Sequence, residues 1–94
     1  MQLYYVFSKK PVKTFFEFVY VDRTDQRIID IVQQPVTIDS EGYYTFTQAP
    51  TYVGYVFAGY ADNAVGAGMK QPGDKYYIGT PGGKYTMYGF YDQT

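Results

Sequence analysis

The chain has 94 residues, a length that suits a single domain, and its eight basic and nine acidic side chains give a net charge of −1. It has no cysteine, which excludes disulfides and thiolate metal sites, and no histidine, the side chain most often used for acid–base chemistry and metal binding near neutral pH. The basic residues are scattered, and no apolar run is long enough to cross a membrane. We therefore expect no enzyme, no metal or cofactor site, no nucleic-acid partner and no membrane insertion.

Aromatic residues are unusually frequent, since thirteen Tyr and seven Phe make up 21% of the chain. Such residues favour half-buried positions on pleated sheets. No segment of ten or more residues shows the 3.6-residue period of an amphipathic helix. The sequence therefore predicts a mainly β fold with about five to six strands and at most a short helical turn.

The first strand is predicted over residues 1–7, and it ends at the charged and proline-containing residues 8–11. Residues 14–21 alternate regularly, with apolar side chains on both faces, which predicts a central strand covered on both sides. The polar residues 22–27 are typical of a hairpin connection, and residues 28–33 form the returning strand, which ends before Pro35.

In the middle of the chain, residues 36–38 are a candidate short strand and residues 39–42 have turn chemistry. Residues 43–46 are compatible with a strand or with a single helical turn. Residues 52–60 are again strand-like, and the two glycines within them indicate a bulge or a close backbone approach.

The last third of the chain begins with the glycine-rich residues 61–73, which we expect to form a long loop that contributes nothing to the core. Residues 76–78 and 84–91 are then predicted as a last pair of strands, with Gly82 and Gly83 in a hairpin turn between them.

Few residues are candidates for catalysis or for binding a metal or phosphate. Asp22 and Asp25 lack the spacing of a calcium loop and are interpreted as solvated turn residues. The glycines near Lys70 lack the order of a phosphate-binding loop, and no helix follows them. Ser8 and Ser40 have no histidine that could activate them. The sequence therefore predicts no catalytic, cofactor-binding or metal-binding residue.

Tyrosine is the one abundant side chain in this sequence that is well suited to contact a ligand. An exposed tyrosine ring can stack on a sugar or pack at a protein interface, and the alternative role for the same residues is cross-strand packing. Thirteen tyrosines are more than a small core would hide, so we expect some of them to form a contact surface. The candidates are Tyr60, Tyr76 and Tyr77, which border the glycine-rich loop.

Three segments resemble known repeat families. Residues 54–60, GYVFAGY, are similar to the GYtFaGWy signature of Listeria–Bacteroides repeats of the internalin B-repeat type, with Tyr60 at the tryptophan position. Residues 85–91 are similar to the terminal xTLYAxW strand of these repeats, with Gly89 and Tyr91 in place of Ala and Trp. Residues 18–22 resemble the V-x-Y-x-D strand of mucin-binding-protein (MucBP) repeats.

This resemblance implies a β-grasp-like mixed sheet over residues 12–94. Residues 1–11 would then be either the end of a preceding repeat or an extra strand of this domain, because residues 3–7 line up with residues 87–91. The implied role is a non-catalytic adhesion or spacer repeat of a bacterial surface protein, extracellular or in the cell wall.

The partners implied are a protein or glycan ligand, or neighbouring repeats. Tyrosine-rich strand edges also make association through strand edges plausible, although Lys9, Lys10, Pro11 and Pro81 are residues of the type that blunts such edges. An alternative role is a bacteriophage virion component, such as a capsid decoration or tail-associated domain.

Overall fold

The computed structural model describes residues 13–94, so the strand and turn predicted for residues 1–11 lie outside the described residues. The described part contains six strands and no helix. The strands are β1 (Thr14–Asp22), β2 (Arg27–Val36), β3 (Tyr43–Thr45), β4 (Tyr55–Ala61), β5 (Lys75–Tyr77) and β6 (Gly83–Gln93). The prediction of a mainly β fold with about six strands is confirmed.

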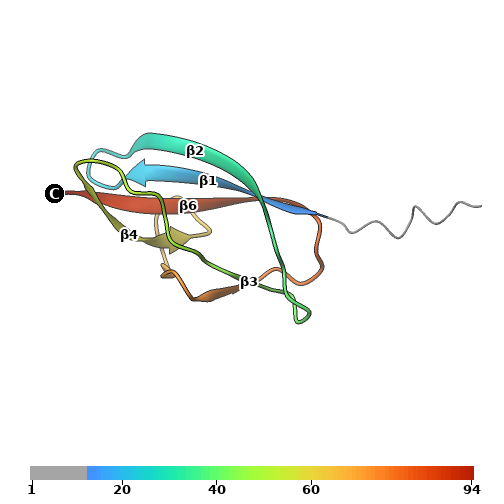
Figure 1. Ribbon diagram of the computed structural model, residues 1–94. Helices are drawn as coiled ribbons and strands as arrows, with labels where there is room; N and C mark the ends of the chain where they lie inside the picture. Colours follow the sequence, from blue (N-terminus) through green and yellow to red (C-terminus); the bar gives the residue numbers. More distant parts are fainter. Residues whose placement is uncertain (1–12) are drawn as a thin grey trace, which may run out of the picture.

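Four of the strands form one mixed sheet in the order β2-β1-β6-β4 (Figure 1). β1 and β2 form the predicted antiparallel hairpin, β6 runs parallel to β1, and β4 runs antiparallel to β6. This is the β-rich mixed sheet that was expected, with β1 and β6 at its centre. Because β1 and β6 are parallel neighbours, the chain between them must cross over the sheet to return to the same end.

The two remaining strands, β3 and β5, form a small antiparallel sheet, in which Tyr44 is paired with Tyr76. The prediction that the last two strands form a hairpin is therefore wrong. β6 instead lies between β1 and β4, which offer partners along most of its eleven residues, whereas β5 has only three. Residues 78–82 connect the small sheet to the large one.

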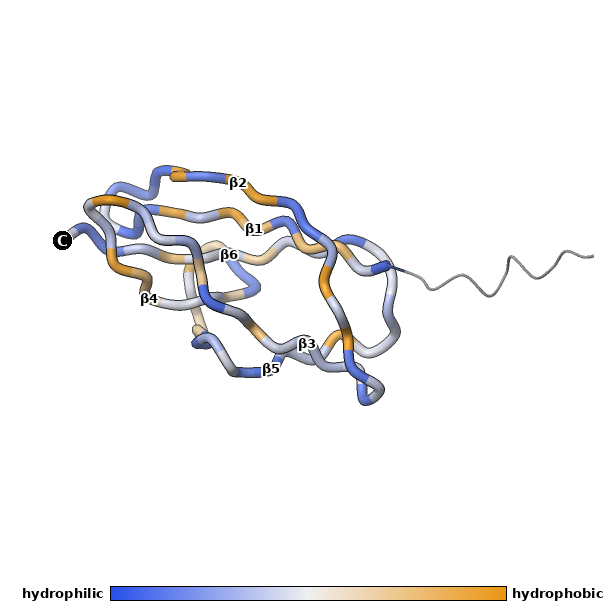
Figure 2. Tube along the Cα trace, in the orientation of Figure 1, coloured by the Kyte–Doolittle hydropathy of each residue, from blue (hydrophilic) through white to orange (hydrophobic). Residues whose placement is uncertain are grey.

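The core consists mainly of aromatic rings that lie between the two sheets. Phe16 and Phe18 of β1 are fully buried, and the Phe16 ring lies 4.6 Å from that of Tyr44 in the small sheet. Phe46 follows β3 and stacks on Tyr60 of β4, with 4.7 Å between the ring centroids. Figure 2 shows that hydrophobic and hydrophilic residues both occur along β1 and β2.

Some strand boundaries differ from the prediction. β2 continues through Pro35 to Val36 rather than ending before the proline, because an edge strand tolerates a residue that has no N–H. The strand expected at residues 36–38 therefore does not form separately. β4 starts only after Gly54, whose φ of +86° belongs to a turn, and the predicted bulge occurs where the register shifts at Gly59.

Within residues 13–94, the second face of the large sheet is largely uncovered, so this part of the chain does not cover residues 14–21 on both sides as predicted. Phe15 on this face is 38% exposed, and Val19 and Val21 are half-buried. The loop at residues 62–68 covers only one part of the face, where Gly66 lies against the ring of the buried Phe90. The loop thus contributes more to packing than its composition indicated.

Gly89 in the middle of β6 provides a test of the core packing. A Cβ at this position would lie 2.5 Å from the Tyr20 ring, so we expect Gly89→Ala to destabilise the fold by about 1–3 kcal/mol through overpacking. In a double mutant, Tyr20→Leu should make room for the new methyl group, so that the two effects on the urea midpoint are less than additive. Simple additivity would contradict this packing.

Candidate functional site

The structure places the three candidate tyrosines in different environments. Tyr60 is only 2% exposed, and its hydroxyl donates to the Thr47 carbonyl at 2.9 Å, so its place in the predicted contact surface is wrong. Tyr76 is half-buried and donates its hydroxyl to Asp62 at 3.0 Å. Tyr77 is 62% exposed and is the member of the trio that a partner could reach most easily.

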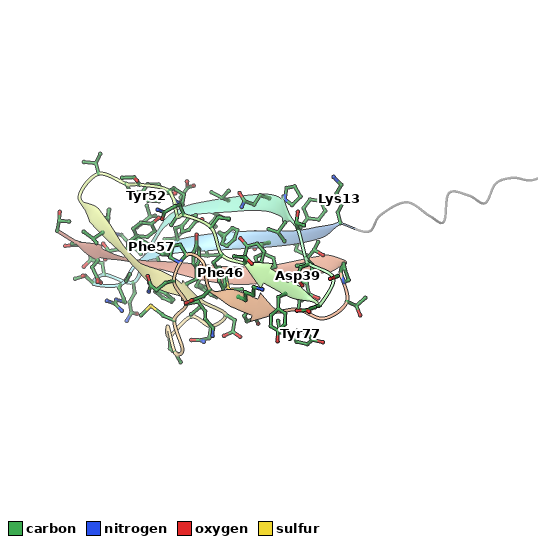
Figure 3. The ribbon with its side chains drawn as sticks, turned by 60° about the horizontal axis from the view of Figure 1, so that its bottom comes forward. Lys13, Asp39, Phe46, Tyr52, Phe57 and Tyr77 are labelled. Atoms are coloured by element: carbon green, nitrogen blue, oxygen red, sulfur yellow. The ribbon has the colours of Figure 1, made fainter. Side chains whose placement is uncertain are left out.

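Tyr77 forms an exposed pair with Tyr43, which sequence reasoning did not select. The two residues are cross-strand partners in the small sheet, with ring centroids 5.2 Å apart at an interplanar angle of 63°. Tyr43 is 36% exposed, and Tyr77 projects away from the body of the molecule (Figure 3). The sequence alone could not reveal this pair, because the two tyrosines are 34 positions apart and their pairing depends on how the strands are arranged.

A turn at Asp39 fixes the position of Tyr43. The Asp39 carboxylate accepts hydrogen bonds from the backbone N–H groups of Tyr43 and Glu41, each at 2.9 Å. The Tyr43 N–H is the main cause that lowers the pKa of Asp39 below its usual value. Lys75 lies 3.9 Å from the same carboxylate and 5.9 Å from the centroid of the Tyr43 ring, within the range of a cation–π contact.

A shallow groove of about 420 Å³ runs beside Tyr43, between β3 and the end of β2. Its wall combines the Tyr43 ring and Val36 with hydroxyl, amide and carboxylate groups. The polar lining residues are Gln34, Thr37, Asp39, Thr45 and Thr47. An aromatic ring flanked by such groups can stack on the apolar face of a sugar and bind its hydroxyls, or it can hold a polar peptide segment.

Asp22, a candidate of the sequence analysis, is a buried structural carboxylate rather than a solvated turn residue. Its side chain has no exposed surface, and its Oδ1 accepts the N–H groups of Thr24 and Asp25. Its Oδ2 accepts hydrogen bonds from the Tyr55 hydroxyl at 3.0 Å and the Gln93 amide at 2.8 Å. These donors, Gln93 foremost, outweigh the effect of burial and lower the pKa of Asp22 to about 2.

The structure also shows where the other residues considered in the sequence analysis lie. Lys70 forms a two-way backbone bridge with Tyr60, and Ser40 is exposed in the Asp39 turn. Ser8 lies outside the described residues. Within residues 13–94, no three carboxylate side chains gather to form a possible metal site.

The two edge strands of the large sheet, β4 and β2, are protected in different ways against pairing with a strand of another molecule. On β4, Lys70 bonds to Tyr60, and the Gln71 side chain donates to the Ala58 carbonyl at 2.7 Å. On β2, the Ile31 N–H donates to the Asp30 carboxylate at 2.9 Å, and Pro35 has no N–H. Because alternate N–H groups along a strand point to the same side, both features reduce the donors that an incoming strand could use.

Of the residues expected to blunt the edges, Pro81 lies in the connection between β5 and β6 rather than on an edge. Lys9, Lys10 and Pro11 are outside the described residues.

No protein-family model, curated protein or solved structure matches this chain. The part of the chain that the structure describes also has no helix that is long and apolar enough to cross a membrane.

The lowered pKa of Asp22 predicts how acid affects stability. Because the folded value of about 2 is below the ordinary value of 3.8, the ionised carboxylate stabilises the fold fully above pH 3.8. This contribution is lost as the pH falls towards 2. We expect Asp22→Asn to be less stable than the wild type at pH 7 and to show a smaller loss of stability on acidification. Urea unfolding at several pH values measures both effects, with Glu41→Gln, an exposed carboxylate change, as the control.

The protection of the β2 edge can be tested separately. We expect the double variant Asp30→Ala, Pro35→Val to expose two additional N–H donors and therefore to self-associate more readily than the wild type. Light scattering over a concentration series measures this association. The matched control is Val53→Ala on the fully exposed turn before β4. Equal association of the double variant and the control would contradict the proposed role of Asp30 and Pro35.

Proposed function

We propose that this chain is a non-catalytic module of a bacterial cell-surface protein, which acts as an adhesion or spacer repeat and contacts a protein or glycan. The observation that carries the proposal is the exposed pair Tyr43–Tyr77 beside a groove lined with polar groups. The pair stands on two hydrogen-bonded strands, so the rings are presented by a defined backbone. A presented aromatic pair of this kind is typical of a contact surface.

Carbohydrate is the ligand class that the site supports best. The Tyr43 and Tyr77 rings provide surfaces for the C–H groups of a sugar, and the neighbouring Thr, Gln and Asp side chains provide donors and acceptors for its hydroxyls. Lys75, whose side chain is 56% exposed, adds a positive charge next to Tyr43. The Asp39 carboxylate lies 3.9 Å from this lysine and balances its charge, so a neutral glycan suits these surroundings.

The placement of the repeat-like segments also supports the proposal. Residues 54–60 and 85–91 fall largely on β4 and β6, which pair with each other, and residues 18–22 lie on the adjacent β1. Tyr60 and Tyr91, at the tryptophan positions of the repeat signatures, are buried and donate their hydroxyls to the carbonyls of Thr47 and Pro50. Each tyrosine therefore has a hydrogen-bond partner for its hydroxyl, so tyrosine is accommodated at both of the positions where the repeat signatures have tryptophan.

The alternative proposal is a virion component, as a capsid decoration or tail-associated domain. The observation that favours it is the open apolar face of the large sheet, because such a face suits assembly with another protein. The full reading frame distinguishes the two roles. Flanking copies with an export signal and a wall anchor would support the surface repeat, and neighbouring virion genes would support the alternative.

Binding to a glycan array tests the role of the tyrosine pair. We expect Tyr77→Ala and Tyr43→Ala each to weaken binding of the best glycan by roughly 5- to 100-fold, as expected for loss of about 1–3 kcal/mol at an aromatic contact. Tyr88→Ala is the control, because Tyr88 lies on the opposite face of the large sheet. Equal loss in all three variants, or no loss in the first two, would contradict the proposed surface.

A further inference from the structure

The described chain enters and leaves the large sheet at opposite ends. β1 begins at Thr14, and its parallel neighbour β6 ends at Gln93. The first residue of β1 is paired with the first residue of β6, and the last residues paired between them are Asp22 and Tyr91. Figure 1 shows the start of β1 and the C-terminus at opposite ends of the sheet. A force that pulls these two points apart therefore acts along the two central strands.

Such a force loads the hydrogen bonds between β1 and β6 in shear. The two strands are direct neighbours, so the force passes from one to the other through their own ladder. Nine residues of β1 are paired with nine of β6 in an unbroken register. Hydrogen bonds in a parallel pair are evenly spaced and run from strand to strand, so a pull along the strands loads all of them together. The strands can then separate only when many bonds break at once.

A steric contact in the core also opposes sliding of the two strands. Tyr20 of β1 is paired with Gly89 of β6, and its ring lies 2.5 Å from the place that a Cβ of this glycine would occupy. A pull on both ends moves β6 towards its C-terminus relative to β1, and a slip of two residues would bring the buried Met87 opposite Tyr20. Because the space beside Tyr20 fits a glycine, the Met87 side chain cannot enter it without displacing the ring.

Side chains tie the two strands together at both ends of the ladder. At the start of β1, the Oγ1 of the buried Thr14 accepts the N–H of Gly82 at 2.7 Å. At the far end, the Arg23 guanidinium donates two hydrogen bonds to the Asp92 carboxylate, at 2.9 and 2.7 Å. The Arg23 N–H also donates to the Tyr91 carbonyl at 2.8 Å. A bidentate pair has a fixed geometry, so it strengthens the ladder where the force leaves it.

We propose that the β1–β6 pair is a mechanical clamp, which allows the domain to bear tension applied between its two ends. A spacer with this property keeps its fold when the protein that contains it is stretched. The inference deepens the spacer role and rests on that part of the proposed function. It does not involve the Tyr43–Tyr77 surface, which lies on the small sheet, so glycan binding and mechanical resistance can fail independently.

Single-molecule force spectroscopy on the full-length chain tests the proposal. The sequence has no cysteine, so pairs of exposed residues can be replaced to give defined attachment points. Lys13→Cys with Thr94→Cys pulls β1 and β6 in opposite directions along their length, which is the shear direction. Thr24→Cys with Thr94→Cys pulls at one end of the sheet and peels the two strands apart, so that their hydrogen bonds break one after another.

We expect the unfolding force to be about twofold or more higher in the shear direction, because nine pairs share a load that peeling places on the last pair alone. Both variants keep all the paired residues of the ladder, and urea unfolding checks that their stabilities are equal. Equal unfolding forces, or a higher force in the peeling direction, would overturn the proposal.

A matched pair of variants tests the clamp at its far end. We expect Arg23→Gln to increase the unfolding rate at constant force in the shear direction by roughly 2- to 5-fold, the effect of losing an exposed ion pair. Lys75→Gln is the control, because the ion pair of Lys75 with Asp39 joins β5 to the turn before β3 and not β1 to β6. Equal acceleration by the two variants would overturn the proposal, because loss of either ion pair would then act through general stability.

Discussion

The parallel pairing of β1 with β6 is the constraint on which the rest of the structure depends. Parallel neighbours enter from the same end of a sheet, so the chain between them must cross over one of its faces. Here the crossover includes β3, β5 and the aromatic residues around Phe46, and it covers one face, whereas most of the other face is left uncovered by residues 13–94. The buried core, the uncovered face and the outward position of the Tyr43–Tyr77 pair all follow from this single arrangement.

Aromatic rings make this crossover possible without a helix. A helix would present a continuous apolar stripe to the sheet, whereas three-residue strands and irregular segments bury few side chains each. Large rings compensate, since each buries a large area, and neighbouring rings such as Phe46 and Tyr60 stack closely. The buried tyrosine hydroxyls also bind carbonyls of the irregular residues 47–50, which satisfies backbone groups that no strand pairs.

Polar residues in the described part of the chain contribute to both structure and surface. The Asp22 carboxylate joins the β1–β2 turn to Tyr55 and Gln93 on two other strands, and the Asp39 carboxylate shapes the turn that presents Tyr43. Both carboxylates have lowered pKa values because they accept several hydrogen bonds. The same kind of interaction thus stabilises the interior at one site and positions an exposed ring at the other.

The sequence by itself determined most of the strands of the described residues, because alternation in β1 and turn residues such as those at 39–42 are local signals. It also determined the β-rich class, and it indicated a bulge or a close backbone approach at Gly54 and Gly59, of which the structure has a bulge just before Gly59. Only the tertiary structure decided which strands pair, so it alone placed β6 beside β1, buried Tyr60 and joined Tyr77 to Tyr43. The physical reason is that burial and strand pairing depend on contacts between residues far apart in the chain, and a local pattern of tyrosines is the same whether its rings face the core or the solvent.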